Sequence, residues 1–173
     1  MNEQTARVLP DVLAPGLKAI FCGLNPGARA AATGHHFEGR GNRFWTVLHQ
    51  AGFTPRRLTP QEDRELPAFG YGLTTVVARP TASARELSRS EYLAAVDELQ
   101  RKLVLLRPRC VAFLGKAAYS ALSQRTIVDW GAQAATFGGA SVWVLPNPSG
   151  LNRGFSLDAL VAAYRALRVA LEA

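Results

Sequence analysis

Four short apolar segments, each followed by a turn, constrain the fold of this chain most. They lie at residues 18–24, 73–77, 110–114 and 142–145. Their hydrophobicity is continuous rather than alternating, which indicates strands that are covered on both faces, as in a parallel sheet. Helical periodicity, with apolar residues three and four positions apart, occurs between and after them, at 44–51, 92–106, 115–122 and 157–171.

Capping signals support these helices. Ser88 and Glu91 have the spacing of a capping box, Ser156 precedes the last helix, and Asn42 is a candidate cap for the first. Pro108 prevents the helix at 92–106 from continuing. Strands that alternate with helices predict an α/β sandwich with a mainly parallel sheet.

The length of 173 residues corresponds to one domain, spanning 1–173. Residues 1–12 carry no apolar stretch of the signal-peptide kind, and we expect 1–12 to be a flexible N-terminal extension of a monomer. No apolar run reaches the length of a membrane span, so no membrane partner is expected. Cys22 and Cys110 sit in apolar runs, which favours buried free thiols and a reduced, cytoplasmic compartment.

The charge balance points toward an anionic partner. The net charge is +7, and 17 of the 20 basic residues are arginines, which suit bidentate recognition of phosphate. A nucleic acid fits this composition. The competing interpretation is that arginine-rich usage reflects a GC-rich genome.

Two related turns follow predicted strands. Asn25-Pro26-Gly27 ends the first strand and Asn147-Pro148-Ser149-Gly150 ends the last. Asn-Pro and Gly make turns without any functional requirement. Two such turns at the carboxyl ends of parallel strands nevertheless indicate a ligand site, because open α/β sheets bind ligands there.

The segment 27–41 is a long connection without helical periodicity, and such loops are often functional. It contains His35, His36 and Phe37. The histidines are open to three interpretations: metal ligands, an acid–base pair, or hydrogen-bonding loop residues. No Cys or carboxylate cluster joins them, so no metal site is predicted. The chain also lacks a nucleophile elbow and a Walker loop.

Several segments in order carry a family resemblance. They read GLNPG at 23–27, TGHHF at 33–37, GNRFW at 41–45 and LPNPSGLNR at 145–153, with AGF, GLT, RPT and LGKAAY between the third and the fourth. This chain resembles the mismatch-specific uracil/thymine DNA glycosylases of the uracil-DNA glycosylase superfamily. The resemblance implies the family fold, a three-layer α/β/α sandwich around a four-stranded, mainly parallel sheet, which agrees with the pattern above.

The resemblance also assigns roles. It implies that Asn25 is the catalytic residue that orients the attacking water, and that Phe37 stacks on the extruded base. The implied base-binding residues are Leu24, Gly27, Ala30, His36, Phe37 and Asn147. The implied DNA-binding residues are Arg43, Ser149, Gly150, Leu151, Asn152 and Arg153, with Leu151 and Arg153 filling the gap and contacting the orphaned guanine.

The implied activity is hydrolysis of the N-glycosidic bond of uracil mispaired with guanine in double-stranded DNA, without metal or cofactor, in base excision repair. A base must leave the duplex before it can be reached. The Asn25 amide can hold a water but cannot take its proton, so slow turnover is expected. The four motif loops contain no lysine for a Schiff base, which implies a monofunctional enzyme that leaves an abasic product. The GHH sequence is typical of the thymine-acting branch, so other damaged pyrimidines are not excluded.

Two other classes compete. One is a non-catalytic protein of the same fold that binds mismatches or abasic sites, and the retention of Asn25 and Phe37 argues against it. The other is a small-molecule nucleotide-binding or nucleoside-hydrolysing protein. Such a protein would have no use for the sequence Gly150-Leu151-Asn152-Arg153 or for the excess of arginine.

Overall fold

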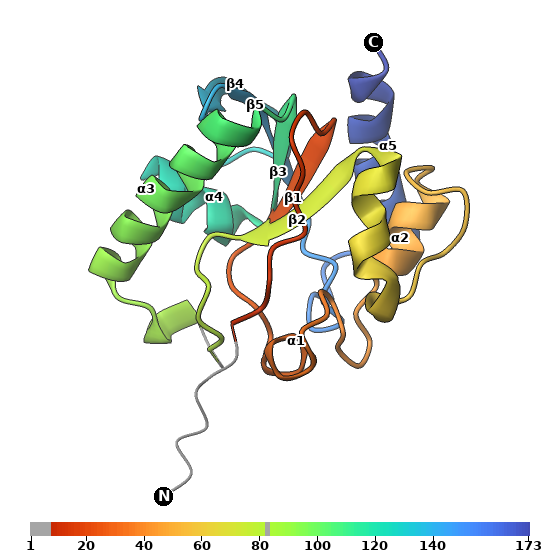
Figure 1. Ribbon diagram of the computed structural model, residues 1–173, viewed down its shortest axis with the longest axis horizontal. Coiled ribbons are helices and arrows are strands. Elements are labelled where there is room, and N and C mark those ends of the chain that lie inside the picture. The colour runs from red at the N-terminus through yellow and green to blue at the C-terminus, as the bar shows by residue number, and fades with distance from the viewer. Residues whose placement is uncertain (1–7, 82–83) are drawn as a thin grey trace, which may run out of the picture.

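A single mixed sheet organises the molecule (Figure 1). The computed structural model describes residues 8–81 and 84–173. The strand order is β2-β1-β3-β5-β4, in which β2, β1, β3 and β5 are mutually parallel and β4 is antiparallel to β5. The strands are β1 (Ala19–Gly23), β2 (Tyr71–Thr75), β3 (Cys110–Leu114), β4 (Gly131–Phe137) and β5 (Ala140–Leu145).

The α/β prediction is confirmed, but the expected count of four strands is wrong. Each apolar run contributes a strand, although β2 begins two residues earlier than its run. The fifth strand, β4, lies at the sheet edge, is mostly exposed, and changes register between Ala132 and Thr136. An exposed, irregular edge strand has neither a continuous apolar run nor a regular alternation, so its sequence lacks a strand signal.

Helices cover both faces of the sheet (Figure 1). The 3₁₀ helix η1 (Pro60–Phe69), α2 (Phe44–Gln50) and α5 (Leu157–Leu171) pack on one face. On the other face lie α3 (Arg89–Leu106) and α4 (Lys116–Ser123). Side chains alternate along β1 accordingly, because Phe21 joins the first core and Ile20 the second.

Two of the predicted caps are present. Ser88 and Glu91 form a capping box at the start of α3, and the Ser156 hydroxyl accepts from the Ala159 amide at the start of α5. The residue that precedes α2 is Arg43 rather than Asn42, although Asn42 Oδ1 still accepts from the Phe44 amide at 3.0 Å. The segment predicted as a loop at 27–41 contains a short helix, α1 (Ala28–Thr33).

Residues 9–12 are packed rather than extended into solvent. Leu9 and Val12 are buried, and Val12 exchanges two backbone hydrogen bonds with Leu73. Asp11 accepts from the Thr74 hydroxyl and from the Lys102 ammonium, each at 2.7 Å. The prediction of a flexible extension over 1–12 is therefore wrong for 9–12, and residues 1–7 of it lie outside the described residues.

Cys22 in β1 and Cys110 in β3 are fully buried free thiols, as predicted. Burial raises the pKa of both, that of Cys110 to about 11. Each thiol is therefore protonated at neutral pH.

Candidate active site

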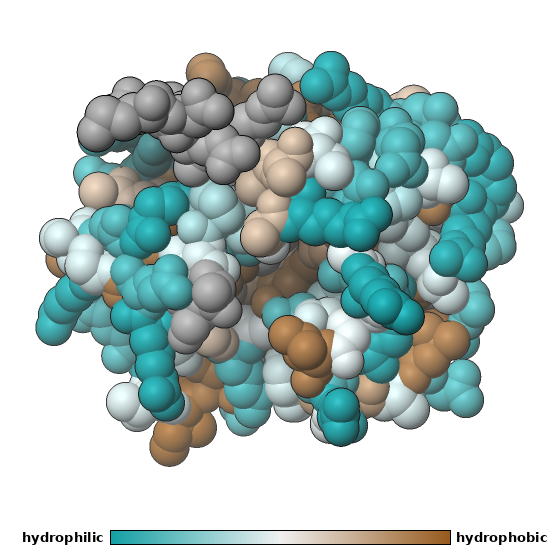
Figure 2. Space-filling view, turned by 90° about the horizontal axis from the view of Figure 1, so that it is seen from below, coloured by the Kyte–Doolittle hydropathy of each residue, from teal (hydrophilic) through white to brown (hydrophobic). Residues whose placement is uncertain are grey.

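The carboxyl ends of the parallel strands meet at one edge of the sheet, and a cavity of about 500 Å³ opens there. Seen from this side, the molecule is hollowed, with an apolar floor and hydrophilic residues around it (Figure 2). The cavity is lined by Asn25 and by every residue predicted to bind the base: Leu24, Gly27, Ala30, His36, Phe37 and Asn147. Of the predicted DNA-binding residues, Ser149 and Leu151 also line it, whereas Arg43, Gly150, Asn152 and Arg153 do not.

Asn25 follows β1, and its amide is held by the segment after β2. Its Nδ2 donates to Thr81 Oγ1 at 2.7 Å and to the Arg79 carbonyl at 3.3 Å. These two bonds use both amide donors and fix the side-chain plane. No hydrogen bond to Asn25 Oδ1 occurs within residues 8–81 and 84–173, so this oxygen is left to accept from a water in the cavity.

Gly27 leaves bare backbone on the cavity wall. A Cβ placed there would meet nothing within 4 Å, and the backbone conformation, with φ −68°, is open to any residue. Neither crowding nor strain therefore requires glycine. A ligand can approach the peptide backbone closely at this point.

The histidine segment is anchored by buried polar groups. The His36 amide donates to Asp63 Oδ2 at 3.0 Å, and His35 Nδ1 lies 3.5 Å from Asp63 Oδ1. Trp45 Nε1 donates to the His36 carbonyl at 3.1 Å. Asp63, on η1, is only 1% exposed. Of the three interpretations of the histidines, the structure therefore favours hydrogen-bonding loop residues.

The His36 ring is also fixed by a backbone group. Its Nε2 lies 2.6 Å from the Pro10 carbonyl, which can only accept, so Nε2 carries the proton. Burial lowers the pKa of His36. The ring is therefore neutral at pH 7, with Nδ1 as a hydrogen-bond acceptor.

Phe37 is held in a conformation that few aromatic residues adopt. Its φ is +57°, in the left-handed region, and its ring stacks on Phe44 with centroids 3.9 Å apart and an interplanar angle of 20°. Stacking uses one face of the ring, and Phe37 also lines the cavity. Because Phe37 is only half-buried, the part of its ring that lines the cavity can contact a planar ligand.

The loop from 147 to 153 is braced internally. Asn147 Oδ1 accepts from the Ser149 amide at 2.9 Å, Asn152 Nδ2 donates to the Asn147 carbonyl at 2.9 Å, and Ser149 Oγ accepts from the Leu151 amide at 3.2 Å. At its start, the buried Tyr164 hydroxyl of α5 donates to the Pro146 carbonyl at 2.9 Å. The loop is therefore a fixed structure at the end of β5.

Arg43 makes hydrogen bonds that were not predicted. Its guanidinium donates to the carbonyls of Phe155, Ser149 and Asn152 at 2.7–3.0 Å. These three contacts turn the guanidinium toward the protein backbone. Arg43 thus clamps the loop that carries the other predicted DNA-binding residues, and its assignment to DNA stays a prediction.

Leu151 protrudes from this braced loop. It is 92% exposed, the highest value among the exposed large hydrophobic residues, and it lies at the cavity. Arg153 is exposed as well. Gly150 packs against Gly41, since a Cβ on Gly150 would lie 2.7 Å from the Gly41 carbonyl oxygen. The loops that carry GNRFW and SGLNR therefore touch through bare backbone.

Sequence reasoning missed Thr81, Asp63 and the Pro10 carbonyl. Thr81 was part of a matched segment, RPT, without an assigned role. The one sequence signal for Asp63 is that it is a carboxylate in the segment that also contains the apolar residues Leu66 and Phe69. Pro10 acts through its backbone, which leaves no sequence signal.

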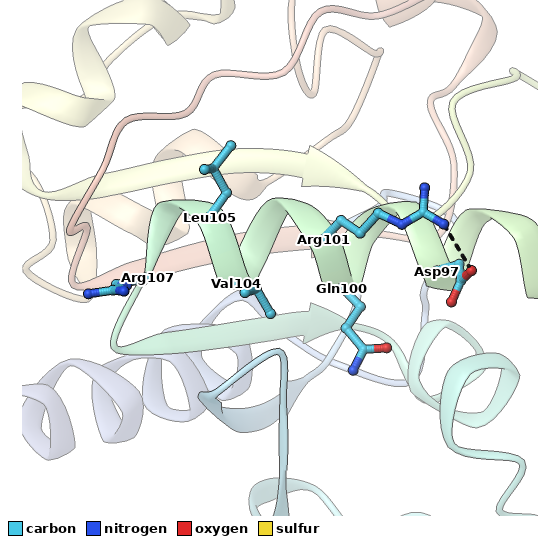
Figure 3. Close-up of a pocket in the computed structure, with 6 residues that line it drawn as sticks. All are labelled: Asp97, Gln100, Arg101, Val104, Leu105 and Arg107. Atoms are coloured by element: carbon cyan, nitrogen blue, oxygen red, sulfur yellow. Dashed lines mark hydrogen bonds and ion pairs between the residues drawn. The ribbon is translucent and has the colours of Figure 1, made fainter.

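A separate hollow lies along α3 (Figure 3) and shares no lining residue with the cavity at the carboxyl ends of the strands. It is lined by Asp97, Gln100, Arg101, Val104, Leu105 and Arg107, and Asp97 accepts from Arg101 at 3.3 Å. It contains none of the predicted site residues. Across residues 8–81 and 84–173, no three His, Cys, Asp or Glu side chains gather as a metal site. In the same residues no helix is both long and apolar enough to cross a membrane.

Comparison with known proteins identifies the family. The sequence profile of the uracil DNA glycosylase superfamily matches residues 10–168, nearly the whole chain. The protein belongs to this superfamily, and membership supports DNA glycosylase activity.

A solved structure shares the fold. It is the solution NMR structure of a "putative Uracil DNA glycosylase" from Methanosarcina acetivorans, at 22% sequence identity and a TM-score of 0.61. The match covers 94% of this chain and 98% of that one.

Proposed function

We propose that this protein is a monofunctional DNA glycosylase that removes uracil mispaired with guanine from double-stranded DNA, acting as a cytoplasmic monomer in base excision repair. One observation carries the proposal. An anchored amide, Asn25, and a half-buried aromatic ring, Phe37, line one cavity whose rim bears the exposed Leu151.

Base extrusion is the first step. Mispaired bases leave the stack more easily than paired ones, which favours G·U over A·U. Leu151, on its braced loop, fills the space that the extruded nucleotide leaves. The uracil enters the cavity and stacks on the part of the Phe37 ring that lines it.

Bond cleavage follows. As the N-glycosidic bond breaks, positive charge develops on the sugar and negative charge on the departing uracil. Asn25 Oδ1 accepts a hydrogen bond from the attacking water and so directs its lone pair at the sugar carbon. Backbone N–H groups of the Gly27 turn stabilise the uracil anion. The water oxygen bonds to the sugar carbon as the bond from carbon to the uracil nitrogen breaks; the water's proton passes to solvent, and the released uracil anion takes up a proton from solvent. No carboxylate is needed as a base, because the leaving group departs readily.

The residues that line the cavity include no lysine, so the abasic strand is not cleaved by β-elimination. The decisive assay incubates the protein with G·U duplex in the presence of EDTA and looks for alkali-labile breaks. Breaks that appear only after alkali support the proposal. Activity lost with EDTA and restored by a divalent cation would overturn the metal-free mechanism. A G·T duplex in parallel determines whether thymine is also a substrate.

The second candidate is a non-catalytic protein that binds mismatches or abasic sites. Tight binding to G·U duplex with no breaks after prolonged incubation would favour it. The asymmetric anchoring of Asn25, with both donors occupied and the acceptor free, favours catalysis over simple binding.

A further inference from the structure

A second cavity, of about 620 Å³, adjoins the first. The two share Arg29, Phe37, Glu38, Gly39 and Asn42 in their walls. The second is completed by residues of the segments around α2 and η1: Arg40, Gly41, Trp45, Arg57, Leu58, Thr59 and Pro60. The proposed mechanism makes no use of this space.

Three arginines from different segments line the second cavity: Arg29, Arg40 and Arg57. All three are exposed. In the described part of the chain, no carboxylate lies within ion-pair distance of their guanidinium groups. The neighbouring Arg56, by contrast, pairs with Glu62 and Glu65.

Glu38, in the same wall, does not neutralise the arginines by direct contact. Its Oε1 accepts from Gln61 Nε2 at 3.1 Å, and its Oε2 is buried. The cavity therefore presents three unpaired guanidinium groups, which are rigid forks suited to the oxygens of phosphates.

The arginine cavity also lies beside the protruding loop. Arg40 is bonded to Gly41, whose backbone packs directly against Gly150, the residue before Leu151. A duplex positioned with Leu151 in its stack thus has its sugar–phosphate backbone close to Arg40.

We propose that Arg29, Arg40 and Arg57 form a phosphate-binding groove for the DNA backbone that flanks the extruded nucleotide. This proposal rests on the proposed function only in that DNA is the ligand, and it does not depend on the chemical step. It provides affinity that is independent of base identity, because phosphate contacts position a protein on DNA without reading its sequence.

The test measures binding rather than excision. Affinity for a duplex with a non-cleavable abasic-site analogue is measured over a range of salt concentrations for the wild type, Arg40→Gln, Arg57→Gln and the double variant. Removal of one arginine–phosphate ion pair should flatten the slope of log K against log salt by about 0.9. The double variant should thus show about twice the flattening of either single variant. Arg29 is left intact because it also lines the base cavity.

Arg109→Gln is the matched control. Arg109 is exposed and directly precedes β3, so it lies at the amino end of that strand, opposite the carboxyl ends where the candidate site lies; the same loss of charge there should leave the slope unchanged. Arg40→Lys and Arg57→Lys should retain the slope, since lysine still neutralises a phosphate. If Arg109→Gln flattens the salt slope as much as Arg40→Gln or Arg57→Gln does, the effect comes from the overall loss of charge, and the groove proposal is overturned.

A second measurement locates the contact on the DNA. Single phosphates near the abasic analogue are replaced by neutral methylphosphonate. The wild type should lose affinity at one or two positions, and the double variant should be insensitive at the same positions. If the double variant instead loses affinity for free dUMP, with the salt slope on duplex unchanged, the groove is a small-anion site and the proposal fails. If the wild type excises no uracil but the variants still flatten the salt slope as expected, the phosphate-binding groove stands and the proposed glycosylase function fails.

Discussion

Asn25 is the residue on which the proposed chemistry depends. Asn25→Ala removes the acceptor that holds the water, and a misplaced nucleophile costs on the order of 100-fold in rate. Single-turnover excision from G·U duplex should fall by that amount, while binding to abasic duplex stays near wild type. Asn25→Asp keeps one oxygen to accept from the water and places its second oxygen where the Thr81 hydroxyl can donate to it, so this variant should retain far more activity. A rate for Asn25→Ala within about threefold of wild type, roughly 0.65 kcal/mol, would disprove the assignment.

His36 makes stability depend on pH. Burial lowers its pKa in the folded protein, so folding favours the neutral ring. Its stabilising contribution is complete above the unfolded pKa of about 6.5 and is lost as pH falls through the lower, folded value. Melting temperatures from pH 8 to pH 4.5 should show a decline below about pH 6.5. His36→Gln keeps a donor for the Pro10 carbonyl, and its melting temperature should fall less below this pH. A pH profile identical to that of the wild type would refute the role of His36.

At the scale of single residues, the sequence predicts the candidate site residues but not their hydrogen-bond partners. Asn25, Phe37 and Asn147 stand in turns and motifs that can be read directly. Thr81 lies 56 positions from Asn25, and Asp63 lies 27 from His36. Such pairs form only when segments that are distant in the sequence come together at the carboxyl ends of the strands. A single sequence does not show which distant residues come together in the fold. The contacts of Arg43 with the 147–153 loop and Phe155 were missed for the same reason, because its three carbonyl partners lie more than 100 positions away.

Among the elements, the loop at 147–153 is the one that we propose contacts the duplex. Leu151→Ala removes most of an exposed apolar side chain, worth roughly 1.5–3 kcal/mol when buried in the DNA stack, so duplex excision should slow about tenfold or more. Single-stranded uracil offers no space to fill, and its excision should change little. Thermal stability should also hold, since Leu151 is 92% exposed.

Leu105→Ala on α3 is the control, because this residue is 80% exposed and lines the hollow along α3 rather than the candidate site. It should leave both activities unchanged. Equal losses on duplex and single-stranded substrates for Leu151→Ala, or a large drop in its melting temperature, would show that the side chain stabilises the protein instead.

Element prediction succeeded where the periodicity was strong. The buried strands and the amphipathic α3 and α5 follow from apolar patterns and capping residues. The exceptions are β4, whose residues are mostly exposed, and α1, whose six residues are too few to show a period. Short or exposed elements form through tertiary contacts, which local sequence does not encode.

For the whole molecule, the N-terminal segment belongs to the fold. Deletion of residues 1–12 removes buried Leu9 and Val12, the ladder with Leu73, and the Pro10 carbonyl that holds His36. Two buried apolar side chains alone are worth about 3–6 kcal/mol, so chemical denaturation should show a lower unfolding free energy by at least that order. Deletion of residues 1–7 leaves every one of these contacts in place and serves as the control. Equal stability of the two truncated proteins would contradict this role.

Because both native thiols are buried, a fluorescent dye can be attached to a single introduced cysteine. Because Cys22 and Cys110 are fully buried and protonated at neutral pH, maleimide dyes should ignore both. A cysteine introduced at Val8, 61% exposed and next to Leu9 in the cavity wall, would then be the single reactive position without removal of either native thiol. A dye at this position would report, in real time, when a nucleotide enters the cavity and when it leaves.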